Sequence, residues 1–148
     1  YCIKVFNDKN NIFESNINEL FIDRDHRILY IGVADKLSTR LLQELRAKGH
    51  GTFFRSLGAI LGYLPPEGSL RNMSNKHNYK FSDLDKLAII DWINENLKVT
   101  WIEHSLNSSP IESGLINEYH TFLNIKHNSP VLKELLERRA HCIEIANR

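Results

Sequence analysis

Three short segments of the chain carry the spacing of apolar side chains that is typical of β-strands. Residues 1–6 alternate between apolar and polar side chains with a period of two. Residues 27–33 are apolar almost throughout, which predicts a buried or central strand, and residues 98–103 predict a third strand. Residues 7–11 have the composition of a turn, whereas residues 12–27 fit either a short helix or an irregular strand. We expect the first two strands to pair as a hairpin across a long loop.

Five further segments repeat their apolar residues every three or four positions, which predicts amphipathic helices. These helices are expected to begin near Leu37, Thr52, Asp83, Pro110 and Pro130, and the last of them reaches about Asn147. Thr52 is the expected N-cap of the second helix, and Ser109 is that of the fourth. The polar residues 67–80, between the second and third helices, are expected to form a loop.

Three strands and five helices in mixed order predict an α/β or α+β fold with a small sheet. The sheet is expected to be three-stranded, mainly antiparallel and flanked by the helices. We expect one domain over residues 1–148, with the helix at about 130–147 packed on it. With 42% hydrophobic residues, a chain of 148 residues buries roughly 68–70% of its unfolded surface. No apolar run is long enough to span a bilayer, so no membrane partner is expected.

The cysteines and the first ten residues indicate a cytoplasmic protein. Cys2 and Cys142 lie at opposite ends of the chain and form no CxxC pair. This arrangement suits reduced thiols that pack as small apolar groups inside the cell. Residues 1–10 lack the basic start and the apolar stretch of a signal peptide.

The charge balance limits how the chain can bind a nucleic acid. Nineteen Lys and Arg against eighteen Asp and Glu leave a net charge of +1, whereas nucleic-acid binders often carry a clear basic excess. Local clusters of positive charge must therefore make any such contact. The seven histidines show no metal-ligand spacing, and the chain has neither a GxSxG motif nor a Walker loop. A structural zinc site, a serine nucleophile and a nucleotide cofactor are thus not indicated.

The strongest local pattern is Tyr30-Ile31-Gly32 at the end of a strand, with Arg40 ten residues after the tyrosine. A tyrosine at a strand end presents its phenol at the rim of the sheet. Gly32 lets the backbone or a bound phosphate come close, and Arg40 offers a planar fork for a phosphate. The alternative interpretation is a core tyrosine, a turn glycine and a solvated arginine.

A second pattern is the carboxylate of Glu112, which shares a predicted helix face with Leu115, Ile116 and Tyr119. A carboxylate on an inward face is costly unless it is neutralised or binds a cation. Equally, a glutamate three residues after Ser109 fits a capping box. Asn124 follows this helix, where it either bonds backbone or phosphate or simply forms a turn.

Read together, these elements resemble the GIY-YIG nuclease family over nearly the whole chain. Tyr30-Ile31-Gly32 corresponds to the YIG element, and Arg40 stands at the family's usual distance behind it. Glu112 fits the acid that opens a late helix, and Asn124 fits the family's asparagine. The segment at 52–62 is similar to one found in small stand-alone bacterial members.

The resemblance implies hydrolysis of DNA phosphodiester bonds with one divalent ion, Mg²⁺ or Mn²⁺, held by Glu112. In this scheme Tyr30 or Tyr1 orients or deprotonates the attacking water, and Arg40 neutralises charge on the scissile phosphate. Gly32 and Asn124 are expected to support the site and to position the phosphate. Tyr1 is the only candidate for the tyrosine of the family's first motif.

Two further residue sets follow from helix position. Lys36 and Arg55 are expected to contact DNA, with Arg55 facing water opposite the apolar stripe of its helix; the alternative is an ordinary solvated helix face. Glu44 stands where many relatives have a His or Tyr, so it is expected to repel phosphate and weaken activity. Trp92 and Trp101 are expected to pack in the core.

Three functions therefore remain open: a metal-dependent endonuclease, a catalytically weak or inactive nucleic-acid-binding module on the same scaffold, and a structural or interaction domain. Geometry separates the third from the others, because the first two require Tyr1, Tyr30, Arg40 and Glu112 to line one surface.

Overall fold

The computed structural model describes residues 1–6, 11–22, 27–103 and 108–148. Its elements, in chain order, are β1 (Cys2–Val5), α1 (Ser15–Ile22), β2 (Ile28–Ile31), α2 (Leu37–Arg46), α3 (Thr52–Ile60), α4 (Asp83–Asn96), β3 (Leu97–Thr100), α5 (Ser108–Tyr119) and α6 (Lys133–Asn147). A three-stranded antiparallel sheet and six helices in the described parts of the chain confirm the predicted α+β class. No helix among these residues is both long and apolar enough to cross a membrane.

The sheet has the strand order β2-β1-β3, with both neighbours antiparallel to β1. The predicted hairpin of the first two strands is confirmed, with Ile3 opposite Tyr30 and a bulge after it. β2 stands at the edge of the sheet, and residues 122–124 cover its outer side; Leu29 and Ile31 are buried. There Phe122 N donates to the carbonyl of Ile28 at 3.2 Å, and Leu123 N donates to that of Leu29 at 2.7 Å.

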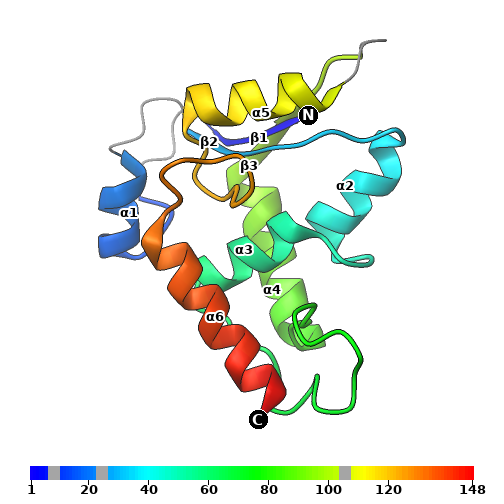
Figure 1. Cartoon of the computed structure of the whole chain (residues 1–148). Coiled ribbons are helices and arrows are strands. Elements are labelled where there is room, and N and C mark those ends of the chain that lie inside the picture. The colour runs from blue at the N-terminus through cyan, green and yellow to red at the C-terminus, as the bar shows by residue number, and fades with distance from the viewer. Residues whose placement is uncertain (7–10, 23–26, 104–107) are drawn as a thin grey trace.

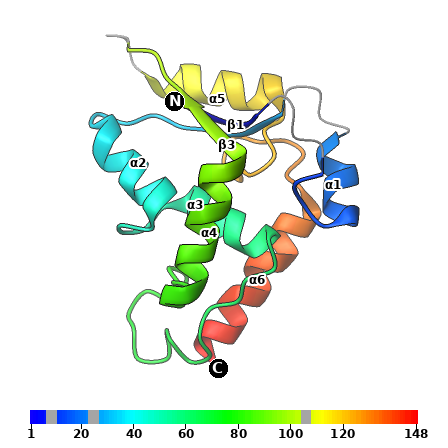
Figure 2. The same cartoon turned by 180° about the vertical axis from the view of Figure 1, so that it is seen from behind.

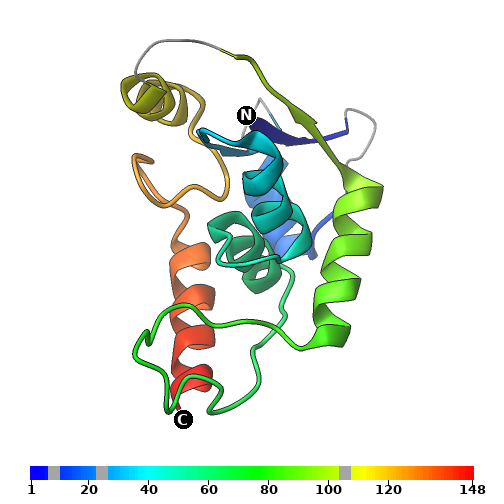
Figure 3. The ribbon, with the colours of Figure 1, turned by 90° about the vertical axis from the view of Figure 1, so that its right-hand side faces the viewer.

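The helices lie on different sides of this sheet. α5 runs across the end of the molecule that carries the strands, while α2, α3, α4 and α6 lie on the opposite side (Figures 1 and 2). Viewed from the side, α3 lies in the middle, with α4 and α6 flanking it (Figure 3). The core thus forms between the sheet and α3, and α5 is left to face the edge of β2.

The central position of α3 changes the interpretation of its sequence. Every residue from Phe53 to Ile60 is buried, so the helix has no solvent face. The predicted single apolar stripe is therefore incomplete, and the expectation that Arg55 faces water is wrong: its exposure is 9%. Periodicity reveals one packed face of a helix, but here α2 and α6 cover other faces as well.

Several boundaries and side chains also differ from expectation. Residues 12–27, which fitted either a helix or a strand, contain the helix α1.

Trp92 packs against Phe13, with ring centroids 5.4 Å apart, as expected of a core residue. Trp101 does not: it lies just beyond β3 and is 57% exposed. Both cysteines are free, and the Cys142 side chain is buried as predicted.

Two helical glycines differ sharply in their surroundings and provide a test of the packing. A Cβ on Gly58 would overlap the ring of Phe81 and approach Ile89, whereas a Cβ on Gly114 would meet nothing within 4 Å. We expect Gly58→Ala to lower the free energy of unfolding by about 1–3 kcal/mol, because the core is already filled. Gly114→Ala, the matched control, should raise it by about 0.5–1 kcal/mol by removing backbone freedom from the unfolded chain. Urea unfolding of both variants measures the difference, and equal effects would contradict the close packing around α3.

Candidate active site

Two tyrosines meet at the end of the β1–β2 pair. Tyr1 pairs with Gly32 through backbone hydrogen bonds of 2.8 and 3.0 Å, while Tyr30 lies opposite Ile3. Tyr1 and Tyr30 are therefore diagonal neighbours on one face of the sheet. Their rings stack with centroids 6.3 Å apart, and the Tyr30 ring also meets Phe53 of α3 edge-on at 5.6 Å.

Gly32 is required by this pairing of rings. A Cβ at position 32 would lie 2.5 Å from the Tyr1 Oη and 2.6 Å from its Cζ. The close approach that the sequence predicted for this glycine is thus made, within the chain, by the phenol of Tyr1. Any larger residue at position 32 would displace that phenol.

Asn124 fixes the same strand end from the side. Its Oδ1 accepts a hydrogen bond from Ile31 N and its Nδ2 donates to Ile31 O, both at 2.9 Å. Thr121 Oγ1 donates to the same Oδ1 at 2.9 Å. Asn124 is only 5% exposed, so its amide acts on the site through the backbone between Tyr30 and Gly32.

Glu112 approaches the tyrosines from α5. The face that it was expected to share is the inward one, since Leu115 and Tyr119 are half-buried and Ile116 is buried. Because α5 begins at Ser108, Glu112 stands a full turn inside the helix, beyond the predicted capping position. Within the described residues its carboxylate accepts no hydrogen bond, so the capping-box alternative is not supported.

Arg40 approaches the tyrosines from α2. Its guanidinium is 39% exposed and lies 3.4 Å from Glu44, with Gln43 Oε1 at 3.5 Å from the same Nη1. Lys36, which is exposed, lies on the same side, where Lys36, Thr39, Arg40 and Gln43 line an open hollow. The guanidinium of Arg40 is thus held through Nη1, and its side chain remains partly open to solvent.

The charges of Arg40 and Glu112 both act on the pair of phenols. Burial raises the pKa of Tyr1 and of Tyr30 well above the ordinary range, and the carboxylates of Glu44 and Glu112 raise it further. The positive charge of Arg40 acts in the opposite direction on both. The two phenols at the end of the β1–β2 pair are therefore close enough to feel both the guanidinium on α2 and the carboxylate on α5.

Glu44 has a role that the sequence did not reveal. It is fully buried, and its Oε2 accepts a hydrogen bond of 2.8 Å from Phe53 N in the first turn of α3. Burial raises the pKa of Glu44, while the Phe53 N–H and Arg40 oppose that rise. Thr52 was expected to cap α3, but the helix begins at Thr52 after Gly51, without a side-chain cap from either residue. The carboxylate of Glu44 takes that place, turned inward, and does not stand at the surface where it would repel phosphate.

Arg139 is a second residue that helix periodicity did not assign to this region. From α6 it donates to Ser56 Oγ at 2.9 Å and to Thr52 O at 3.4 Å. Its positive charge also lowers the pKa of Tyr30 slightly against the effect of burial. A position late in the chain carries no local signal of this contact, because it depends on how α6 packs on α3.

Comparison with known families agrees with this geometry. A family model described as the GIY-YIG catalytic domain matches residues 1–141. The chain belongs to the GIY-YIG family. No curated protein and no solved structure matches the chain. As a GIY-YIG catalytic domain it has a nuclease-type function, which implies a nucleic acid as its substrate.

GIY-YIG domains generally use a divalent metal, and the donor set of this one has a single carboxylate. Among the described residues no group of three or more His, Cys, Asp or Glu side chains is arranged to enclose a metal ion. Of the two carboxylates whose charge acts on both phenols, Glu44 is engaged by Phe53 N, whereas Glu112 accepts no hydrogen bond from the described residues. One hard oxygen ligand is compatible with Mg²⁺, which keeps several waters and takes further ligands from substrate phosphates.

Glu44 can be tested separately from the metal. We expect Glu44→Ala to lower the free energy of unfolding by about 1–3 kcal/mol, because it leaves the buried Phe53 N–H without an acceptor. Glu44→Gln keeps an oxygen at that position and should lose clearly less. Glu95→Ala, at an exposed position of α4, is the control and should change stability by less than about 0.5 kcal/mol. Urea unfolding provides the measurement, and equal stability of Glu44→Ala and Glu95→Ala would remove the capping role.

Proposed function

We propose that this GIY-YIG domain is an endonuclease that hydrolyses phosphodiester bonds of DNA and requires Mg²⁺ or Mn²⁺. The observation that carries the proposal is that Arg40 and Glu112, of opposite charge, act on the same two phenols. Such a set offers a cation for the phosphate, a ligand for a metal and hydroxyl groups for a water molecule. An interaction domain would have no need of opposite charges that act on one pair of phenols.

The tyrosines in this scheme act as hydroxyl groups. A phenol with an ordinary pKa near 10 is already a poor base at neutral pH. Because burial raises the pKa of both Tyr1 and Tyr30, each keeps its proton under physiological conditions. They therefore orient the attacking water and the phosphate by hydrogen bonds, and the alternative in which a tyrosine deprotonates the water is not favoured.

Arg40 supplies the positive charge for the scissile phosphate. Its contacts with Glu44 and Gln43 leave part of the fork open to solvent. A positioned donor of this kind lowers a reaction barrier by roughly 3–4 kcal/mol in other enzymes, because it is aimed before the charge develops. Lys36, beside it on the open hollow, is placed to contact a neighbouring phosphate.

Glu112 would hold the metal ion. A divalent ion at this carboxylate supplies charge stabilisation for the phosphate and for the departing oxygen. With such an ion held by Glu112 on α5 and the guanidinium of Arg40 on α2, positive charge would reach the phosphate from two different helices. Arg40 would bind the phosphate directly and Glu112 would act through the metal ion, so the two residues have different roles in orienting the substrate.

Loss of Glu112 is the principal test of this function. We expect Glu112→Gln to reduce Mg²⁺-dependent nicking of supercoiled plasmid by about 100-fold or more, and EDTA to abolish nicking by the unmodified protein. Glu118→Gln, at an exposed position of the same helix, is the matched control and should retain activity. Undiminished nicking by Glu112→Gln would refute the metal role. Salt-sensitive DNA binding with no nicking under any condition would instead favour the non-catalytic binding module.

The hydroxyl of Tyr30 can be removed without its ring. Tyr30→Phe preserves the contact with Phe53, so we expect thermal stability close to that of the original protein and a nicking rate lower by roughly 10- to 100-fold. Tyr63→Phe, a half-buried tyrosine between α3 and the following loop, serves as the control. Full activity of Tyr30→Phe would show that this hydroxyl takes no part in the reaction.

A further inference from the structure

Arg55 is a buried cation without a partner. It lies in the middle of α3 with an exposure of 9%, and its Nε is enclosed without a hydrogen-bond acceptor. No ion pair or hydrogen bond joins its guanidinium to another side chain or carbonyl of the described residues. An enclosed donor without an acceptor is costly, and this makes Arg55 a candidate contact for an anion that enters from outside.

No neighbouring charged group of the described residues forms an ion pair with the Arg55 guanidinium. Burial lowers the pKa of Arg55 and the positive charge of Arg139 lowers it further, whereas Tyr79 and Glu44 act in the opposite direction. Glu44 is already engaged by Phe53 N and Arg40, and Arg139 is bonded to uncharged oxygens. This region of α2, α3 and α6 therefore carries an excess of positive charge over its one buried carboxylate.

A small pocket lies against Arg55. Its lining includes the backbone turn at Gly49 and Gly51, together with the side chains of Arg55, Lys80 and Lys86. About 20 Å³ of it is deep enough for the centre of a water-sized group, which is enough for one or two oxygen atoms but too little for a base or a sugar. Two facts thus point to a small anion: an unpaired buried guanidinium and a pocket of matching size.

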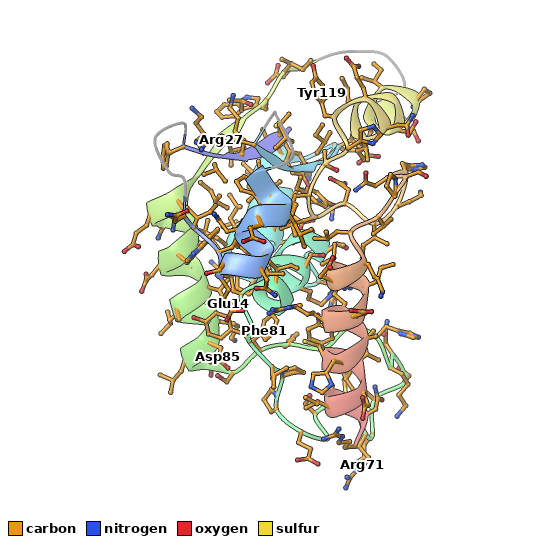
Figure 4. The ribbon with its side chains drawn as sticks, turned by 90° about the vertical axis from the view of Figure 1, so that its left-hand side faces the viewer. Glu14, Arg27, Arg71, Phe81, Asp85 and Tyr119 are labelled. Carbon is orange, nitrogen blue, oxygen red and sulfur yellow. The ribbon has the colours of Figure 1, made fainter. Side chains whose placement is uncertain are left out.

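Two lysines, Lys80 and Lys86, also line the pocket. Lys80 is exposed, and Lys86 is half-buried and paired with Asp83 at 2.5 Å. Phe81, between these lysines in the sequence, packs between α3 and α4 and fixes the wall (Figure 4). The pocket is therefore lined by one buried arginine and two lysines, set among apolar and aromatic residues that include Phe54 and Phe81.

We propose that this pocket binds one phosphate group of the DNA backbone, away from the bond that is cleaved, with Arg55 as the principal contact. The inference rests on the proposed function for its source of phosphate. Gln43 lines both this pocket and the open hollow of Lys36 and Arg40, so the two places adjoin at this residue of α2. A strand held at Arg40 would reach Arg55 by passing over Gln43.

Arg55→Met separates this role from a structural one. Because an unpaired buried charge does not stabilise the fold, the variant should have an unchanged or higher melting temperature. In the unmodified protein, inorganic phosphate at constant ionic strength should raise the melting temperature, and Arg55→Met should abolish that rise. A lower melting temperature with an unchanged phosphate response would overturn the proposal.

DNA binding provides the second measurement. With Glu112→Gln as the common background to prevent cleavage, the affinity for duplex DNA is measured against salt concentration. Arg55→Met should weaken binding by about tenfold and reduce the magnitude of the log–log salt slope by about one, as expected for one lost phosphate contact. Lys133→Gln, at the exposed start of α6 and far from the α2–α3 turn in Figure 1, is the control and should leave the slope unchanged.

The remaining outcomes are also decisive. If Arg55→Met does not fold, the exposed Lys80→Gln must still reduce the phosphate response and the salt slope, and no reduction refutes the site. A phosphate response without any change in DNA binding would mean that the pocket takes a free anion and not the substrate. Failure of the unmodified protein to nick DNA would reject the endonuclease function, while the salt slope and the melting temperature would still report on the pocket.

Discussion

The arrangement of this molecule depends on one inward-facing carboxylate. Glu44 joins two helices by accepting a hydrogen bond from Phe53 N while lying beside Arg40. Gly51 makes this possible, since a Cβ there would lie 2.7 Å from the carboxylate and overlap the carbonyl of Gln43. The same carboxylate therefore caps the central helix of the core and holds Nη1 of Arg40, whose charge acts on the phenols. Loss of Glu44 would affect both the packing of α3 and the position of Arg40.

The other side of the site is fixed by backbone pairing. Residues 122–124 run along the outer side of β2, and Asn124 bonds both polar groups of Ile31. A strand edge that would otherwise expose its N–H and C=O groups is thereby closed. Because Ile31 lies between Tyr30 and Gly32, closing the edge also determines where the phenols stand. The asparagine influences the chemistry from a distance, through main-chain geometry.

Much of this could be predicted from local sequence patterns. The three strands, the helix ends near Ser82 and Asn96, and the inward face of α5 all follow from spacing and cap chemistry, which are local properties. The pattern of Tyr30, Arg40 and Glu112 also singled out residues whose charges act on the phenols at the strand end, although their roles stay a prediction. Failures occurred where a residue's neighbours come from distant parts of the chain. Arg55 lies on a helix covered on all sides, and the cap of α3 comes from the preceding helix, so neither leaves a local trace.

Glu112 comes late in the sequence, so it would join the other proposed site residues only after α5 has been synthesised. Glu112 belongs to a helix that contacts the sheet chiefly along β2, whereas the phenols and Arg40 come from the first 40 residues of the sequence. During synthesis, Tyr30 and Arg40 leave the ribosome before Glu112 does. On the proposed function, a chain whose α5 has not yet docked on β2 would hold Arg40 and the phenols without the metal-binding carboxylate, and we expect it to leave nucleic acid uncut.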